Sequence, residues 1–439
     1  MLRVSLLEAA AVALLGACGF QPGLAGGGAH DGSTGSDAGS GGNDLDGGAG
    51  SDGSDGGTVL TGRCSSPGVL RDDFTTGVTG GTGQWFALGM SSVIGGVLSV
   101  TPSSASGFAG YYSKHTIDLT GANVTVEVPA MISTTANATA GLYLYVDATH
   151  YLALYQQLGM LVAEYQNGSG LMATKIAYDA TKRWLRIAET SGQITFQWSP
   201  DDAMWTAFGP ALATPAFTTS LGLGLGGISY DNQPHGSAQF DNLNQAADPA
   251  PWCKASTFVD RFARTTIGLD WSRRLVPNNG NGCLPTVNNG AHFDQSGNAN
   301  SRCWLVTAKA FDLAGSSAMT YVPAITSSEA GWSVFLRGVT DNLDAFYIQY
   351  QDPNMVCAQV GGATPICKAY SAADLYFRLR QAPGQLYFEA SSDATTWATI
   401  AQVAAPFSVA ATQFELGTAT TTSFGGTLQL TIPVYNTPP

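Results

Sequence analysis

The sequence predicts an all-β protein in which two tandem jelly-roll β-sandwiches follow a signal peptide and a disordered linker rich in Gly, Ser and Asp. Three observations predict this fold. Short runs of alternating apolar and polar residues recur between turn signals, and no long segment has the 3.6-residue apolar period of a helix. A hairpin pattern occurs twice, at residues 184–205 and 376–397. The low share of charged residues, 12%, fits an extracellular β protein.

The repeated hairpin indicates that a whole domain is duplicated. The two copies align without a gap at an offset of 192 residues, and each joins two alternating runs through a Gly turn. The shared residues are Arg186/Arg378, Gly192/Gly384, Gln193/Gln385, Phe196/Phe388, Ser199/Ser391, Asp201/Asp393 and Trp205/Trp397.

We interpret the shared residues as scaffold. The Ser and Asp form turns by bonding the local backbone. Arg186 and Arg378 are expected to pair with a nearby carboxylate, and Trp205 and Trp397 to return into the core.

Residues 1–17 have the pattern of a signal peptide, with an early Arg3 and an apolar run too short to span a bilayer. The segment ends in Leu15-Gly16-Ala17-Cys18, which resembles the bacterial lipobox. This resemblance implies cleavage before Cys18, lipidation of its sulfur and a stable membrane anchor. Because Gly19 is not aspartate, it also implies the outer membrane, facing the periplasm or the cell surface. An ordinary signal peptide with an incidental cysteine is the alternative.

Residues 18–58 are predicted to be a disordered tether, since Gly, Ser and Asp leave almost nothing to bury. The chain after the tether divides into two similar domains, 59–250 and 251–439. Residues 258–262 repeat the pattern of residues 70–74, and Trp271 answers Trp85.

The net charge of −13 argues against nucleic acid as a partner, because no basic stripe is present to neutralise phosphates. A zinc site would be an alternative use of the cysteines. The sequence contains no CxxC pair, and its five histidines are scattered.

A family resemblance rests on three motifs: Asp72-Asp73-Phe74 followed by Trp85, the repeated W-L-R-I…G…F…S-x-D…W hairpin, and a closing Phe240-Asp241-Asn242 strand. Together they resemble the concanavalin A-like lectin/glucanase fold, to which laminin-G-like modules belong. That fold hosts sugar binders, adhesins, glycosidases and modules with no known ligand, so the resemblance alone does not define a function.

The resemblance also implies a disulfide pattern. In such a sandwich the first and last strands are neighbours, which would bring Cys64 to Cys253. Cys357 and Cys367 flank a turn between strands, and Cys283 would pair with Cys303 across an Asn/Gly-rich insertion.

We do not expect an enzyme. Glycoside hydrolysis needs two carboxylates on opposite sides of the scissile bond. Glucanases of this fold carry them as E-x-D-x-x-E on one strand, and this sequence lacks that pattern.

Two ligand sites are predicted. Sugars bind exposed aromatic faces, and the candidates are Tyr143, Tyr145, Tyr151, Tyr155, Tyr347 and Tyr350. A core role for these tyrosines is the alternative. A structural Ca²⁺ could bind Asp72, Asp73 and Asp241 in the first domain if the first and last strands pair.

The leading hypothesis is therefore a surface lipoprotein that binds a polysaccharide or surface glycan, or serves adhesion, without catalysis. A structural cell-envelope interaction protein with no sugar ligand is the alternative. A divergent glycoside hydrolase is the third reading.

Overall fold

The computed structural model describes residues 63–75, 84–102, 108–231, 233, 235–274, 283, 285–296, 302–323, 331–340, 344–351, 354–420 and 427–437. The predicted signal peptide, the tether and Cys18 lie outside the described residues, and the predicted domain boundaries stay predictions. None of the helices in the described part is long and apolar enough to cross a membrane. Its helices are the 3₁₀ turns η1 (Pro67–Val69), η2 (Ala216–Thr219) and η3 (Ala255–Thr257).

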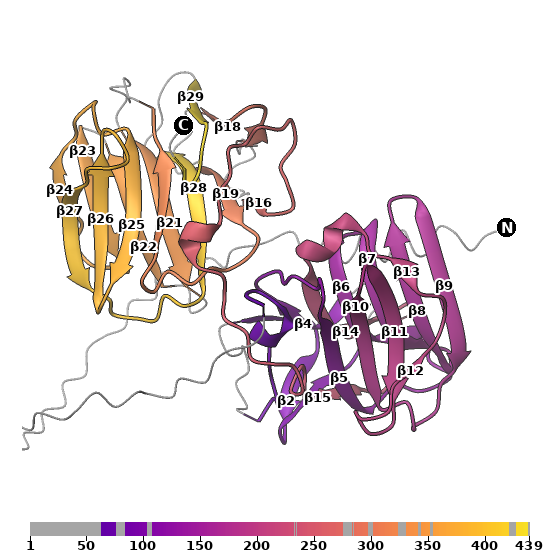
Figure 1. Ribbon diagram of the computed structural model, residues 1–439. Helices are drawn as coiled ribbons and strands as arrows, with labels where there is room; N and C mark the ends of the chain where they lie inside the picture. The colour runs from indigo at the N-terminus through magenta and orange to yellow at the C-terminus, as the bar shows by residue number, and fades with distance from the viewer. Residues whose placement is uncertain are drawn as a thin grey trace, which may run out of the picture.

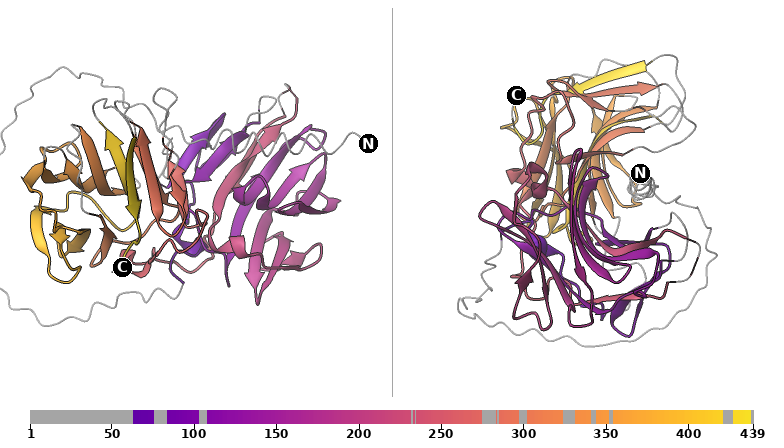
Figure 2. Two further views of the ribbon diagram at one scale, coloured as in Figure 1. Left: turned by 90° about the horizontal axis from the view of Figure 1, so that it is seen from above. Right: turned by 90° about the vertical axis from the view of Figure 1, so that its right-hand side faces the viewer.

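The all-β prediction is confirmed, with two β-sandwiches that share no strand pairing among the described residues (Figures 1 and 2). The first sandwich has a seven-stranded sheet, with every neighbouring pair antiparallel. In spatial order its strands are β1 (Trp85–Leu88), β4 (Phe108–Ser113), β14 (Gly222–Ser229), β6 (Ala138–Asp147), β7 (His150–Gln157), β8 (Met160–Asn167) and β9 (Gly170–Ala177).

An eight-stranded sheet completes the first sandwich. Its strands, in order, are β12 (Thr206–Ala207), β11 (Gln193–Ser199), β10 (Trp184–Thr190), β5 (Asn123–Ala130), β15 (Ala238–Asp241), β3 (Val97–Val100) and β2 (Ser91–Ile94), while β13 (Leu212–Ala213) pairs with β11. Leu142 and Leu223 from the seven-stranded sheet meet Val124 and Leu185 from the eight-stranded sheet in a single buried core.

The second sandwich repeats the strand order of the seven-stranded sheet. The order is β16 (Trp271–Arg274), β19 (Arg302–Thr307), β28 (Thr412–Thr420), β21 (Trp332–Thr340), β22 (Ala345–Gln351), β23 (Met355–Val360) and β24 (Ile366–Ala369).

The opposite layer of the second sandwich is split into two sheets. One holds β20 (Ser317–Tyr321), β25 (Tyr376–Ala382), β26 (Gln385–Ser391) and β27 (Ala398–Ala404), and the other holds β17 (Thr286–Val287), β18 (Ala291–Ser296) and β29 (Thr427–Ile432). A second core lies between these layers and includes Leu336, Ile348, Phe377 and Phe388.

An asparagine closes each sandwich, and we call Asn244, which is buried, and Asn436, which is partly buried, the closing asparagines. The Asn244 amide donates to the carbonyls of Pro67 (3.0 Å) and Leu70 (2.9 Å) and accepts from the amide of Thr125 (2.9 Å). It thereby ties the start of the sandwich, its end and the central strand β5 together.

The second closing asparagine repeats this pattern at the same offset of 192. Asn436 donates to Ala255 (2.7 Å) and Phe258 (2.8 Å) and accepts from Met319 (2.6 Å). Both asparagines have positive φ angles, +54° and +55°, a region that asparagine tolerates better than most residues.

An aspartate that precedes the first strand of each sandwich supports the closure. Asp72 bridges to Leu243, and its carboxylate accepts from the Phe74 amide (2.8 Å) and the Trp85 indole (2.9 Å). In the second sandwich Asp260 bonds the equivalent Phe262 amide and Trp271 indole, both at 2.7 Å.

Three disulfides connect the described cysteines as the resemblance implied. They are Cys64–Cys253, Cys283–Cys303 and Cys357–Cys367. The first closes a loop of 189 residues and sits beside the closure of the first sandwich, where the Ser65 amide donates to Pro251 (2.8 Å). On the loop-closure model such a crosslink contributes about 5 kcal/mol through the unfolded state.

The closing asparagines predict a large local contribution to stability. Asn244→Ala removes three hydrogen bonds and leaves buried backbone groups unpaired, so we expect the free energy of unfolding to fall by about 3 kcal/mol. Asn244→Gly loses the same bonds but relieves the positive φ, so its loss should be smaller. Urea unfolding measures both. Equal stability of Asn244→Ala and the natural chain would contradict the role.

Candidate functional site

The four tyrosines predicted in the first domain lie on one face of the seven-stranded sheet, opposite the core. Strand register pairs Tyr143 with Ala153 and Tyr145 with Tyr151, so their side chains share a face. The alternating Leu142, Leu144, Leu152 and Leu154 point into the core instead. Strand β6 is therefore covered on both faces, as its uniformly apolar sequence predicts.

Further aromatic residues join the tyrosines, and we call the whole set the tyrosine face. Its buried members are Phe108, Tyr112, Tyr143 and Tyr155, and its partly buried members include Phe86, Tyr145, Tyr151 and Tyr230. Phe108 packs against Tyr112 and Tyr143 at centroid distances of 4.5 and 5.8 Å, and Tyr143 stacks on Tyr155 at 5.9 Å.

Glycines on β14 make room for these rings. The sequence from Leu221 to Gly226 alternates Leu and Gly, so the leucines enter the core and the glycines face the rings. A Cβ at Gly222 would stand 2.9 Å from the Tyr145 ring, and one at Gly226 would stand 2.4 Å from the Phe108 ring. Any larger residue would displace the aromatic layer.

Glu164 is the polar centre of the tyrosine face. It is 4% exposed, and its two carboxylate oxygens accept hydrogen bonds from the hydroxyls of Tyr151 and Tyr155, the latter at 2.6 Å. Burial and then the charge of Glu164 raise the pKa of Tyr151 and of Tyr155 well above 10. Both phenols therefore stay protonated, and their oxygens keep lone pairs that can accept from a ligand hydroxyl.

The corresponding face of the second sandwich has different chemistry. Trp304 packs against Phe335 at 5.6 Å, and the Arg302 guanidinium lies 5.3 Å from the Trp304 ring centre. Arg337 forms a 2.7 Å ion pair with the buried Glu415. Aromatic, amide and charged groups thus mix on this face, where the first sandwich is mainly aromatic.

Of the two tyrosines predicted in the second domain, the structure places one on this face. Tyr347 is half-buried there and donates its hydroxyl to Gln359. The prediction that Tyr350 binds a ligand is wrong, because this residue is 1% exposed and packs in the second core. The two residues are three apart on strand β22, so alternation sends them to opposite faces.

The prediction that Asp72, Asp73 and Asp241 bind calcium is also wrong. Both oxygens of Asp72 are bonded by Phe74 and Trp85, Asp73 is bonded by Thr75, and Asp241 accepts from the Asn242 amide. Within the described ranges, no group of three His, Cys, Asp or Glu side chains could hold a metal. These carboxylates serve local turns and the chain closure.

The repeated Ser and Asp form turns in both copies. Ser199 donates to Asp201 and Ser391 donates to Asp393, each at 3.0 Å.

The tryptophan prediction is wrong. Trp205 and Trp397 do not enter the cores. They are half-buried on the outer faces, where Arg186 and Arg378 stack on them at 3.9 and 3.8 Å. Arg378 also pairs with Glu389 as predicted, whereas Arg186 bonds Gln197.

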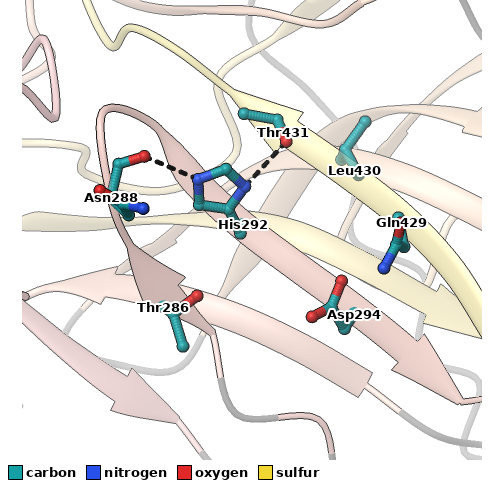
Figure 3. Close-up of a pocket in the computed structure, with 7 residues that line it drawn as sticks. All are labelled: Thr286, Asn288, His292, Asp294, Gln429, Leu430 and Thr431. Carbon is teal, nitrogen blue, oxygen red and sulfur yellow. Dashed lines mark hydrogen bonds between the residues drawn. The ribbon is translucent and has the colours of Figure 1, made fainter. Parts of the chain in front are cut away.

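A separate hollow of about 310 Å³ lies over β17, β18 and β29 of the second sandwich (Figure 3). His292 is fixed in it, because one ring nitrogen bonds the Asn288 carbonyl and the other bonds the Thr431 hydroxyl, both at 2.9 Å. Asp294 and Gln429 lie side by side on neighbouring strands. The full lining is Thr286, Asn288, His292, Asp294, Gln429, Leu430 and Thr431, which offers hydrogen bonds but no aromatic platform.

Comparison with known proteins finds structural matches that each span about two fifths of the chain. No family model matches the sequence, and no curated protein matches it. A Crh5 transglycosylase is 11% identical, covers 42% of this chain and 85% of its own, and has a TM-score of 0.32. A β-glucanase of Bacillus licheniformis is 11% identical over 40% of this chain and 95% of its own (TM-score 0.32). A laminarinase from Flavobacterium is 10% identical over 40% and 97% (TM-score 0.33).

The tyrosine face predicts an alkaline transition. The pKa values of Tyr143, Tyr151 and Tyr155 are raised above the unfolded value of about 10, because burial favours the neutral phenol. Their contribution to stability is therefore present below pH 10 and is lost as the pH rises through the folded values. Phenolate absorbance against pH should show these tyrosines ionising only above the exposed ones.

Glu164→Gln tests the cause of these raised pKa values. Removing the charge should move part of the late absorbance step to lower pH. The control is Glu127→Gln, a similarly buried glutamate on the other sheet that bonds Arg183 and Asn242. An unchanged step in Glu164→Gln would refute the coupling.

Proposed function

We propose that the chain is an exported, lipid-anchored protein that binds glycans without cleaving them, and that the tyrosine face is its main binding surface. One observation carries this proposal. A sheet in a β-sandwich needs a single apolar face to form its core, yet this sheet has a second face of aromatic rings around a buried carboxylate. Rings and fixed hydroxyls are the groups that recognise the apolar faces and hydroxyl edges of sugars.

The half-buried rings of Tyr145 and Tyr151 can receive a sugar at the surface of this face, beside the buried Tyr143 and Tyr155. The Tyr151 hydroxyl is held by Glu164, so little side-chain entropy is lost when a ligand binds it. In the second sandwich, Tyr347 and Arg337 provide a related but more polar surface.

The distribution of carboxylates supports binding rather than hydrolysis. The strands of the first seven-stranded sheet contain two acidic residues, Asp147 and Glu164. Asp147 belongs to a turn with Thr149 and His150, and Glu164 is held by two phenols. The equivalent second sheet contains Glu415, which is paired with Arg337. Among their described strands, neither sheet offers a pair of carboxylates poised across a groove.

Export and anchoring are part of the same proposal. The chain has three disulfides. Disulfides form and persist in oxidising compartments, so their presence agrees with passage out of the cytoplasm. Cys18 would carry the lipid, and the Gly/Ser/Asp tether would hold the sandwiches away from the membrane.

Glycan binding is tested with an array of neutral and acidic glycans. We expect the chain to bind at least one glycan class, and the double change Tyr145→Ala and Tyr151→Ala to weaken neutral-glycan binding by about tenfold or more. Met204→Ala, a change at a 73% exposed residue outside this face, is the control and should bind as before. Absence of binding would favour the envelope-interaction alternative, and release of reducing sugars would favour a hydrolase.

Anchoring is tested by Cys18→Ser. Labelled palmitate should be incorporated into the natural chain and not into this variant, which should also leave the membrane fraction. Equal labelling of both chains would contradict lipidation at this residue.

A further inference from the structure

The outer face of the four-stranded sheet in the second sandwich carries cations stacked on aromatic rings. The Arg378 guanidinium lies 3.8 Å from the centre of the Trp397 ring, and the Arg380 guanidinium lies 3.9 Å from that of Tyr387. Tyr321 meets Tyr376 edge to face at 5.2 Å. We call these six residues, with Glu389, the arginine–aromatic ladder.

The ladder is ordered by strand register. Tyr376 pairs with Tyr321, and in successive rows Arg378 pairs with Glu389 and Arg380 with Tyr387. Rows two residues apart on a strand are about 7 Å apart. Phe377 and Leu379 alternate with them and point into the core, so the ladder is entirely on the outer side of the sheet.

The ladder has an excess of positive charge. The ionisable acidic and basic residues of its four strands are Arg378, Arg380 and Glu389. The Glu389 carboxylate, 3% exposed, accepts from both guanidinium groups, at 2.7 Å in each ion pair. One carboxylate thus serves two cations, on a chain whose net charge is −13. The nearby Asp393 is occupied by the backbone amides of Thr395 and Thr396.

The first sandwich contains the matching stack without this excess. Arg186 stacks on Trp205 there, but Ala188 and Thr195 stand at the positions equivalent to Arg380 and Tyr387. Glu127 and Asp241 lie opposite each other on the same sheet and add negative charge. One Arg–Trp stack therefore suffices for the fold, and the second row is specific to the second sandwich.

We propose that the arginine–aromatic ladder is a binding site for an acidic polysaccharide, with uronate carboxylates bound by Arg378 and Arg380. Stacking holds each guanidinium plane against a ring. Glu389 accepts from Nε of both arginines and from Nη2 of Arg380, and the remaining N–H groups can bind a planar carboxylate in two-point fashion. The partly exposed ring of Tyr321, packed against the buried Tyr376, supplies apolar surface for the neighbouring sugar ring. This site adds a second surface to the proposed glycan binding, and each of the two surfaces can be tested without the other.

The test measures affinity of the full chain for polygalacturonate, with dextran as the neutral probe and dextran sulfate as the sulfated one. We expect binding to polygalacturonate that weakens as NaCl is raised from about 50 to about 300 mM, and none to dextran at this site. The double change Arg380→Ala and Tyr387→Thr, which installs the residues of the first sandwich, should lower the affinity about tenfold or more. Arg186→Gln should leave it unchanged within about twofold.

Arg380→Lys separates geometry from charge. It keeps the charge but loses the planar fork, so it should also weaken binding, and it provides a second variant if the double change fails to fold. Equal affinity of all variants, no binding to polygalacturonate, or equally tight binding of dextran sulfate would overturn the uronate site. The tyrosine-face variant tests the first proposal separately. We expect it to lose neutral-glycan binding and to keep polygalacturonate binding.

Discussion

Closure of the chain on itself is the constraint on which each sandwich depends. A jelly roll places its first and last segments side by side, and these segments here are short and irregular, so backbone pairing alone gives them few bonds. Asn244 supplies three bonds from one buried side chain, and Asn436 repeats them. Because the amide both donates and accepts, it joins the beginning, the end and the middle strand at one point. Leaving any of these groups buried and unpaired would cost far more than a surface bond.

Closure at one end leaves the faces of the sheets free to differ. The cores need only the inward side of each strand, and alternation makes the outward side independent of it. The Leu/Gly alternation around Gly224 serves both purposes: leucines fill the core, while the missing side chains let aromatic rings lie against the strand. The equivalent strand of the second sandwich, β28, carries Glu415 and Gly417, which accommodate Arg337 and Trp304. One scaffold therefore supports two chemically distinct surfaces.

The sequence was sufficient for the fold because alternation, turn residues and the duplicated hairpin all depend on local patterns. Alternation along the strand also predicts that Tyr143 and Tyr145 share a face of the sheet. Tyr347 and Tyr350 are three residues apart, so the same rule places them on opposite faces. The closing asparagines were not predicted, although Asn244 and Asn436 stand at the repeat offset of 192, because their role depends on bonds to segments more than 100 residues away in the chain. Trp205 and Trp397 were misplaced because size favours burial, whereas stacking on an arginine stabilises an aromatic ring at the surface. Such a pairing depends on where a turn places the ring, which composition does not reveal.

Duplication gives a way to separate scaffold from function within a single chain. Residues that repeat with the same contacts are explained by folding alone. Asp72 and Asp260, which each accept a hydrogen bond from a tryptophan indole, are an example. Residues that occupy equivalent positions with different chemistry are not required by the fold, since the other copy folds without them. One such difference is Arg380 and Tyr387, whose equivalents in the first sandwich are Ala188 and Thr195. Another is the tyrosine face, whose equivalent in the second sandwich carries Arg337 and Glu415. Both of these differences lie on outward faces of the sheets, in rows set by strand register.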